Sequence, residues 1–492
     1  MSVRLSAAAL AHMPLGIGVP NYRRSQLSAG IMHFGVGNFH RAHQAVYLDD
    51  LFGAGRDHDW AIVGAGVKDF DVVMRDKLAA QDWLTTVVEQ EAHATAVRVT
   101  GAMIDFVKPF DVGATLDMLS RPNIRIVSLT VTEGGYYISP ATQRFDATHP
   151  DIVADGRAFE APKTAFGLIA AGLKRRRAAG VAPFTVMSCD NIPGNGRVCE
   201  NAVAGVAERA DPELARWIRA NVAFPNSMVD RITPATSDRE RAILRDRWGL
   251  EDNWPVFCEA FRQWVVEDKF PSGRPALETV GVTFTSDVGP YELMKIRILN
   301  GGHATIAYPA GLLDIHFAHE AMEDAQIRTF LDTLTKREIM SVVPPPPGVD
   351  LEAYRLKVAE RFANPKIGDT VARLCLDGSN RQPKFILPTV VDRLKAGASI
   401  RGLALVSALW CRYCYGVSES GKTIPPNDPS WDRLQAAAKP ARQDPNAFLA
   451  MRDIFGELAD TPAYVGAFSH ALSKLWAQGV RSTLDDYLSE RL

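Results

Sequence analysis

The sequence contains no long apolar run. Its most apolar stretch, residues 402–410, is far shorter than the roughly 20 residues that a membrane-spanning helix needs. Near the N-terminus, His12 and Pro14 interrupt the apolar residues and no small-x-small cleavage pattern follows. We therefore interpret this segment as an ordinary mature N-terminus and expect no membrane partner.

Cysteine is also scarce, with six residues in a chain of 492. A chain of this length can bury a sufficient core without disulfides, so we expect reduced, mostly buried thiols in a cytoplasmic protein. Cys411 and Cys414 form a CxxC pattern inside an apolar helical stretch, with no second pair to accompany it. This context favours core packing over a redox or zinc role.

An excess of either charge is absent as well, because 55 Lys and Arg side chains stand against 57 Asp and Glu. Proteins that bind nucleic acid typically show a basic excess, and disordered chains combine high net charge with few apolar residues. Here 47% of the residues are hydrophobic and 23% are charged, as in ordinary soluble globular proteins. The composition therefore favours a small-molecule ligand and no nucleic acid.

The first part of the chain alternates short apolar runs with helical patterns. The sequence predicts strands at 30–34, 60–64, 124–130 and 184–189, and helices that include 39–52 and 163–179. Continuous apolar strands separated by helices are typical of a parallel sheet that is covered on both faces. The predicted fold class is therefore α/β, with a Rossmann-type N-terminal domain.

Beyond about residue 289 the patterns are almost entirely helical. The predicted helices are 291–313, 321–340, 351–362, 367–376, 387–396, 402–414, 447–458, 463–478 and 481–492. Because a single core seldom grows beyond roughly 250–300 residues, we expect two domains. We predict a dinucleotide-binding α/β domain over 1–285 and a mainly α-helical substrate and catalytic domain over 286–492, with the site in the cleft between them.

A glycine-rich turn follows the first predicted strand. Gly35 and Gly37 stand between that strand and a helix, which is the context of a dinucleotide site. One glycine permits the tight turn and the other lets the backbone approach the pyrophosphate. His40 occupies the place of the usual third glycine, so the fingerprint is incomplete and a plain strand-to-helix turn is the alternative. Arg41 either adds charge near a phosphate or lies solvated on the helix.

An acidic residue after the second strand would bind a ribose 2′-hydroxyl and repel a 2′-phosphate. Asp69 and Asp71 are the candidates, although they lie further from the turn than usual because the loop 53–59 intervenes. Lys68 stands beside them and leaves room for NADP. The pattern favours NAD over NADP.

One helical segment of the second domain carries side chains that suit alcohol oxidation without a metal. In an α-helix, Asn300 and His303 would lie about 140° and about 80° around the axis from Lys295, within one broad face. A lysine can accept the hydroxyl proton only if burial or nearby positive charge lowers its pKa, and an asparagine can donate to the developing alkoxide. Gly301 and Gly302 each cost about 1 kcal/mol in a helix relative to Ala, which predicts a bare surface for close approach of substrate or cofactor. The alternative is a partly buried helix with a snorkelling lysine and a core histidine.

A second asparagine, Asn191, follows the predicted strand 184–189. Ligands bind at the carboxyl ends of strands in open α/β sheets. Asn191 is therefore a candidate second donor to the alkoxide, and a plain turn residue is the alternative.

Six blocks spread over nearly the whole chain carry a resemblance to a known family. They are FGVGNFHRAHQA (34–45), IVSLTVTEGGYY (126–137), FTVMSCDN (184–191), FPNSMVDRITP (224–234), KIRILNGGHA (295–304) and DGSNRQPKF (377–385). In these blocks and in their order, the chain resembles the polyol-specific long-chain dehydrogenase/reductase family.

The resemblance implies reversible, NAD-dependent and metal-independent oxidation of a polyol secondary alcohol to a ketose, with D-mannitol and D-fructose as the expected pair. It assigns the general base to Lys295, the oxyanion hole to Asn191 and Asn300, and substrate positioning to His303. It further implies that Glu292 passes the proton to solvent. The implied substrate contacts are Arg373, Asp230, Arg381 and Glu133, and the implied cofactor contacts are Phe34, Gly35, Val36, Gly37, Phe39, Arg41, Asp69 and Val229. Relatives with strict NAD preference often carry two acids where this chain has Lys68 and Asp69.

Several alternatives stay open within and beyond this family. D-arabinitol 4-dehydrogenase, sorbitol dehydrogenase and, less favoured, a hexuronate (fructuronate) reductase are the near ones. A zinc-dependent dehydrogenase would need a third ligand beside the pairs His40/His43 or His316/His319, and none is evident. A non-enzymatic nucleotide-binding protein predicts loss of the base, whereas Lys295 is present. We expect a monomer or a weak homo-oligomer.

Overall fold

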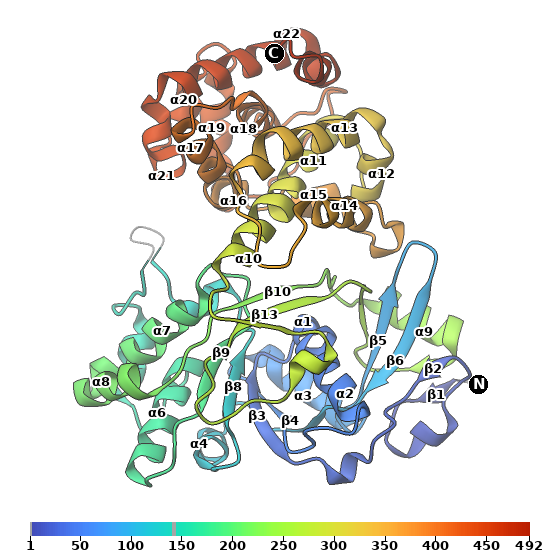
Figure 1. Cartoon of the computed structure of the whole chain (residues 1–492), viewed down its shortest axis with the longest axis vertical. Helices are drawn as coiled ribbons and strands as arrows, with labels where there is room; N and C mark the ends of the chain where they lie inside the picture. Colours follow the sequence, from blue (N-terminus) through green and yellow to red (C-terminus); the bar gives the residue numbers. More distant parts are fainter. Residues whose placement is uncertain (1, 140–143) are drawn as a thin grey trace. The chain divides into compact units, whose positions relative to one another are not determined.

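The computed structural model describes residues 2–139 and 144–492 (Figure 1). The chain divides into a first unit that ends at Val288 and a second unit, Gly289–Leu492. The sequence predicted this boundary near residue 285. In the described part of the chain, no helix is both long and apolar enough to cross a bilayer.

A five-stranded parallel sheet forms the centre of the first unit. Its strands are, in spatial order, β7 (Met103–Phe106), β4 (Ala61–Ala65), β3 (Ala29–Phe34), β8 (Ile126–Leu129) and β9 (Thr185–Ser188). The β3 residues Ile31 to Phe34 pair in register with Ile126 to Leu129 of β8. All four predicted strands of this domain are present, and β7 is an addition.

Helices cover both faces of this sheet, as the continuous apolar strands predicted (Figure 1). Met32 and Phe34 of β3 pack in one core with α4 (Val112–Ser120), α6 (Ala165–Ala178) and α7 (Asn195–Ala210). Ile31 packs in the opposite core with α2 (Gln44–Gly53) and α3 (Asp69–Ala79). Alternation along β3 thus supplies a hydrophobic surface to each layer.

The strand order reverses at β3. From β3 the chain runs outward through β4 to β7, and then returns to place β8 and β9 on the other side. The carboxyl ends of β3 and β8 therefore flank the topological switch point, where open α/β sheets bind ligands. The glycine-rich turn follows β3 directly at this point.

Further small sheets and helices complete the first unit. The strands are β1 (Val3–Arg4), β2 (Ile17–Gly18), β5 (Thr85–Gln90), β6 (Thr95–Thr100), β10 (Ser227–Asp230), β11 (Leu250–Glu251), β12 (Val256–Glu259), β13 (Gln263–Glu267) and β14 (Thr283–Thr285). The helices are α1 (Asn38–Ala42), α5 (Pro150–Arg157), α8 (Pro212–Asn221) and α9 (Asp238–Trp248). The antiparallel β5–β6 hairpin and the β10–β13 pair were not predicted from the sequence.

The second unit is helical and is built around α18 (Arg401–Cys414). Every residue of α18 from Gly402 to Cys414 is buried, because α11, α17, α19 and α22 pack around it. The other α-helices are α10 (Gly289–Met294), α11 (Gly301–Leu312), α12 (Ala318–Glu323), α13 (Ala325–Leu334), α14 (Leu351–Phe362), α15 (Val371–Leu374), α16 (Gly378–Phe385), α17 (Leu387–Lys395), α19 (Trp431–Ala441), α20 (Asn446–Leu449), α21 (Arg452–Phe455) and α22 (Pro462–Leu488).

The predicted helix 291–313 is not one regular α-helix. It consists of α10, a π-helical turn over Lys295–Asn300, and α11. The backbone N–H of Gly301 bonds to the carbonyl of Ile296, five residues earlier, which is the π-helical pattern. Short π-helical segments inside α-helices occur often at functional sites.

Candidate functional site

The turn after β3 requires glycine at its first position. Gly35 has φ of +90°, and a Cβ there would lie 2.2 Å from the carbonyl oxygen of Thr130. A Cβ on Gly37 would meet only the oxygen of Gly35, at 3.9 Å, so the backbone at Gly37 borders open space. The turn therefore has the bare backbone surface that a pyrophosphate needs, at the sheet's switch point.

The side chains around this turn divide into buried and accessible ones. Phe34 and Val36 are each 1% exposed and belong to the two cores, so only their backbone faces the turn. Phe39 is half-buried and stacks on His43, with ring centroids 4.9 Å apart. The predicted cofactor contacts of Phe34 and Val36 are thus limited to main-chain atoms.

His40, which occupies the position of the usual third glycine, stacks on His33. The rings of His33 on β3 and His40 on α1 lie 3.4 Å apart and nearly parallel, and both side chains are buried. His33 also contacts Thr130 Oγ1 through Nε2 at 2.9 Å, and Thr130 Oγ1 donates to the carbonyl of Gly35 at 2.6 Å. Burial lowers the pKa of His33 to about 3, so the ring is neutral at physiological pH. The stack and its hydrogen bonds hold the turn against β3 and β8.

Arg41 is buried behind the same turn rather than solvated on the helix. Its guanidinium donates to the carbonyl of Trp254 at 2.5 Å and to Asn38 Oδ1 at 2.9 Å. Burial lowers the pKa of Arg41 to about 10, which leaves the side chain protonated at neutral pH. Arg41 therefore fixes α1 and adds a positive charge behind the turn.

The two acids after the second strand have different surroundings. Asp71 is buried, and its Oδ2 accepts the backbone N–H groups of Val67 and Lys68 at 2.8 and 2.9 Å. Asp69 is exposed at the first position of α3, directly after this loop. Asp71 thus serves the loop geometry, and Asp69 is the acid open to a ligand.

Asp190, which was not among the predicted site residues, ties the end of β9 to the loop after β8. Its carboxylate accepts the backbone N–H groups of Val131 and Thr132 at 3.0 and 2.8 Å, and the hydroxyl of Tyr136 at 2.7 Å. Asn191 is the next residue and is exposed. No local sequence pattern marks this contact, because the residues that Asp190 joins are 58 and 59 positions away in the chain.

Two predicted substrate or cofactor contacts lie on β10. Val229 and Asp230 are 4% and 5% exposed, and pair with Trp264 and Gln263 of β13. Glu133 begins the short 3₁₀ helix Glu133–Tyr136 after β8, but its side chain lies outside the part of the chain that the structure describes.

In the second unit, the π-helical turn changes the predicted geometry of the catalytic side chains. A π-helix bonds residue i to residue i+5, so Lys295 and Asn300 lie close to the same side of the axis rather than about 140° apart. Lys295 is 6% exposed, and Asn300 Oδ1 is buried with no hydrogen-bond partner among the described residues. The buried Arg297 bonds to Asp392 at 2.6 Å and anchors this turn to α17. The π-helical turn thus places the predicted base and one predicted donor closer together around the helix axis than an α-helix would.

His303 lies on the following α11 and is surrounded by positive charge. Its ring stacks on Phe362, with centroids 4.2 Å apart. Burial, and then the charges of Arg373, Arg361, Arg381 and Lys295, hold the pKa of His303 well below its usual value. The ring is therefore neutral and can both donate and accept a hydrogen bond. The cations that act on it include the predicted Arg373 and Arg381.

Arg361 is part of this cationic group, although the sequence analysis did not single it out. It is 6% exposed near the end of α14, where the sequence pattern shows only one of several charged helix residues. Arg373 forms a bidentate ion pair with Asp369, with Nε to Oδ1 at 2.5 Å, and Arg381 donates to the carbonyl of Leu374 at 2.9 Å. The charge of Arg373 is thus largely compensated within the protein.

The prediction that Gly301 and Gly302 leave a bare surface for a ligand is wrong. Gly301 is buried, and a Cβ there would meet the carbonyl oxygen of Phe385 at 3.5 Å and Ile386 at 3.9 Å. A Cβ at Gly302 would lie 3.2 Å from the ring of Phe362 and 3.4 Å from Leu331, so protein side chains already cover this surface. Gly302 is needed for close packing of Phe362, the ring on which His303 stacks. The glycine therefore positions the histidine indirectly.

Glu320, beside the pair His316/His319, accepts the backbone N–H groups of His316 and Phe317 and thereby caps the N-terminus of α12. Over residues 2–139 and 144–492, no group of three or more His, Cys, Asp and Glu side chains is arranged to hold a metal ion.

Comparison with known proteins places the chain in a family. The mannitol dehydrogenase Rossmann domain matches residues 29–279, and the mannitol dehydrogenase C-terminal domain matches residues 287–476. A mannitol 2-dehydrogenase of Cereibacter sphaeroides is 55% identical over 471 residues, covering 96% of this chain and 98% of the relative.

Two solved structures are similar over almost the full length. The mannitol 2-dehydrogenase of Pseudomonas fluorescens, in a ternary complex with NAD and D-mannitol, is 42% identical with a TM-score of 0.89, covering 99% of this chain and 100% of the other. A D-sorbitol dehydrogenase in substrate-free form is 35% identical with a TM-score of 0.90, covering 98% of this chain and 100% of the other. With both domain models matched and full-length relatives at this identity, the chain belongs to the mannitol dehydrogenase family.

Proposed function

We propose that this chain oxidises D-mannitol to D-fructose, and catalyses the reverse reduction, with NAD as the hydride carrier and Lys295 as the general base. The chain is an NAD-dependent polyol oxidoreductase, as its full-length likeness to mannitol 2-dehydrogenases and to a complex with NAD and D-mannitol supports. The observation that supports the finer proposal is the π-helical turn over Lys295–Asn300, together with the electrostatic effect of Lys295 on His303.

The residues of the first unit fit a dinucleotide. Gly35 and Gly37 give a turn with exposed backbone at the switch point, and Asp69 is an accessible acid at the end of the second strand. We propose that Phe34, Val36 and Phe39 contribute around the turn, that Arg41 supplies positive charge, and that Val229 contacts the cofactor. NAD, when bound, accepts the hydride that leaves the carbinol carbon.

Lys295 is proposed to take the proton of the reacting hydroxyl. A lysine can serve as a base when burial and neighbouring cations favour its neutral form. Lys295 is buried. It also acts electrostatically on His303, as Arg361, Arg373 and Arg381 do, so both burial and neighbouring cations support this role. In ketose reduction the same amine, then protonated, returns the proton to the developing alkoxide.

Asn300 is proposed to stabilise the alkoxide. The Oδ1 atom of Asn300 is buried and has no hydrogen-bond partner among the described residues. Its N–H₂ group can donate a hydrogen bond to the substrate oxygen that gains negative charge. Asn191, exposed at the end of β9, is proposed as the second donor. A neutral His303, held by Phe362, would orient a substrate hydroxyl.

The remaining predicted residues complete the proposal. Glu292 precedes Lys295 by three residues. We propose that Glu292 passes the proton taken up by Lys295 to solvent. Arg373, Asp230, Arg381 and Glu133 are proposed to bind polyol hydroxyl groups. The bidentate pairing of Arg373 with Asp369 favours a neutral polyol over a hexuronate, because a substrate carboxylate would meet an already compensated cation.

Cofactor choice follows from the exposed acid. Asp69 would accept a hydrogen bond from a ribose 2′-hydroxyl and repel a 2′-phosphate, whereas the neighbouring exposed Lys68 would soften this discrimination. We therefore propose that the protein prefers NAD but retains measurable activity with NADP.

Initial rates of dinucleotide reduction test the proposal. They would be measured with EDTA present on D-mannitol, D-arabinitol, sorbitol and D-mannonate, each with NAD and with NADP. Fastest turnover of D-mannitol with NAD is expected. A clear preference for D-arabinitol or sorbitol would move the protein to that branch of the family, activity on mannonate alone would favour a hexuronate reductase, and dependence on added zinc would contradict a lysine base.

A further inference from the structure

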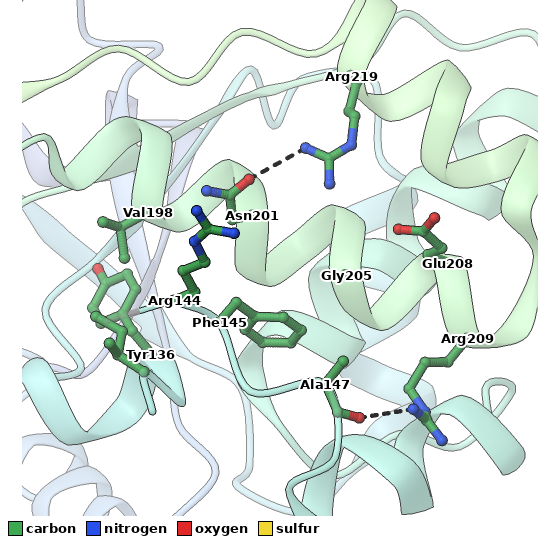
Figure 2. A pocket seen from close by; sticks show the side chains of 11 residues that line it. Tyr136, Arg144, Phe145, Ala147, Val198, Asn201, Gly205, Glu208, Arg209 and Arg219 are labelled. Atoms are coloured by element: carbon green, nitrogen blue, oxygen red, sulfur yellow. Dashed lines mark hydrogen bonds between the residues drawn. The ribbon is translucent and has the colours of Figure 1, made fainter. Parts of the chain in front are cut away.

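A pocket lies in the first unit, and its lining includes no residue of the glycine-rich turn (Figure 2). It has a volume of about 560 Å³, within the range of small-molecule sites. Its walls come from residues 136–138 and 144–147, from α7 and from α8. No role in polyol oxidation has been assigned above to the polar side chains that surround it.

The charge of the pocket is positive. Its lining includes Arg144, Arg209 and Arg219 against one carboxylate, Glu208, an excess of two positive charges. Arg144 has no carboxylate within 4 Å among the described residues, and in Figure 2 its guanidinium and that of Arg219 both point toward Asn201. Guanidinium groups that converge on a cavity and outnumber the carboxylates of its lining favour an anionic ligand.

The guanidinium groups are held by neutral or weak partners. Arg219 donates to Asn201 Oδ1 at 3.4 Å and lies 3.7 Å from the half-buried Glu200, while Arg209 donates to the carbonyl of Ala147 at 2.8 Å. Exposed ion pairs of this length contribute little. These contacts orient the cations without neutralising them.

One wall of the pocket is aromatic and is made possible by a glycine. The ring of Phe145 lies so close to α7 that a Cβ at Gly205 would be 2.4 Å from Cε1 of the ring. The buried Tyr136 lines the pocket as well. A molecule with an uncharged body and a charged head would therefore find an apolar surface beside the cations.

The wall residue Tyr136 connects the pocket to a proposed catalytic residue. Its hydroxyl donates to Asp190 at 2.7 Å and contacts Ser188 Oγ at 2.6 Å. Asp190 immediately precedes Asn191, the proposed alkoxide donor, and holds the loop after β8 through Val131 and Thr132. A ligand that displaces Tyr136 would thus shift Asn191.

We propose that this pocket is a regulatory site for a small phosphorylated molecule, such as a sugar phosphate. A phosphate monoester carries nearly two negative charges at neutral pH, which matches the excess of two cations. Two guanidinium forks can each form paired hydrogen bonds to its oxygens. Binding acts on turnover through Tyr136 and Asp190, and this second part rests on the proposed function.

Isothermal titration calorimetry tests the binding step independently of turnover. Glucose 6-phosphate, inorganic phosphate and unphosphorylated glucose would be titrated into the full chain with saturating NAD, so that the turn after β3 cannot supply the anion site. We expect saturable 1:1 binding of glucose 6-phosphate, weakened at least about tenfold in Arg144→Ala/Arg219→Ala. The matched control, Arg216→Ala, removes an exposed arginine from the same helix α8 and should bind within about twofold of the wild type.

The outcomes separate the alternatives. No saturable binding up to about 20 mM, or equal loss of binding in Arg216→Ala and in the double variant, overturns the site. For the second step, saturating glucose 6-phosphate should change the KM for the polyol in the wild type and in Arg216→Ala but not in the double variant. Binding without any change in kcat or KM overturns the regulatory role and leaves the binding site.

Discussion

Replacement of Asp190 by Asn provides a stringent test of how the first unit positions Asn191. The Asp190 carboxylate is 7% exposed and accepts three hydrogen bonds, from Val131 N–H, Thr132 N–H and the Tyr136 hydroxyl. An asparagine has nearly the same size but only one accepting oxygen. Its N–H₂ group would face at least one backbone donor.

The magnitude follows from these contacts. Hydrogen bonds to a charged group contribute about 1.5–3 kcal/mol and neutral ones about 0.5–1.5, so two retained bonds weaken by about 1 kcal/mol each. The third, from a backbone N–H that would face the N–H₂ group, is lost at about 1.5–3 kcal/mol. We expect the free energy of unfolding to fall by about 3–5 kcal/mol in total. A displaced Asn191 would lower kcat/KM for D-mannitol by roughly 10- to 100-fold.

The assay pairs urea unfolding, followed by circular dichroism, with steady-state turnover of the same samples. Asp117→Asn is the matched control, because Asp117 lies on α4 with a side chain 74% exposed and paired only with Arg175 at 3.0 Å. This control should lose no more than about 0.5 kcal/mol and keep its activity. If Asp190→Asn behaves like the control in both measurements, the Asp190 network does not position the site.

Two further predictions concern acid stability and cofactor choice. Burial lowers the pKa of His33 and of His43 from 6.5 to about 3, so the unfolded chain binds protons at a pH where the folded chain does not. The free energy of unfolding is therefore highest above about pH 6.5 and falls toward pH 3 by about 1.4 kcal/mol per pH unit for each histidine. Urea midpoints that stay constant between about pH 7.5 and 5.5 would refute this prediction. Asp69→Ala should raise the NADP-to-NAD ratio of kcat/KM by about tenfold, because one repulsive charge near the 2′-phosphate is removed. Asp76→Ala, on an exposed acid of the same helix α3, should leave the ratio unchanged, and an equal shift in both variants would exclude Asp69 as the discriminating residue.

The sequence was most informative where chemistry is local. The turn at Gly35 and Gly37 and the strands around it follow from backbone rules that act over a few residues, and the structure shows both. The helix 351–362 was predicted with the bounds that α14 has, because its apolar spacing is regular and an aspartate precedes it. The fold class is confirmed for the same reason.

The sequence was least informative where contacts join distant residues. Asp190 meets a loop 58 and 59 residues away, and no local pattern marks that contact. The packing of Phe362 against Gly302 likewise joins two separate helices, so local sequence does not predict it.

The π-helical turn at Lys295–Asn300 was missed for a different reason. A projection at 3.6 residues per turn assumes an α-helix and therefore separates Lys295 from Asn300. The π-helical turn places these two residues closer together around the axis. The β5–β6 hairpin was missed although its Thr- and Val-rich runs, 85–90 and 95–100, fit strand preferences.

The central claim, that Lys295 is the general base, is tested most directly by single-turnover formation of NADH from D-mannitol in Lys295→Ala. Lys357→Ala, which removes a half-exposed lysine of α14 that pairs with Glu360, is the control. We expect Lys295→Ala to bind NAD like the wild type, as measured by fluorescence quenching, but to form NADH about 10²- to 10⁴-fold more slowly, while the control keeps the wild-type rate. A rate for Lys295→Ala within a few-fold of the wild type, without added amine, would show that another group removes the proton.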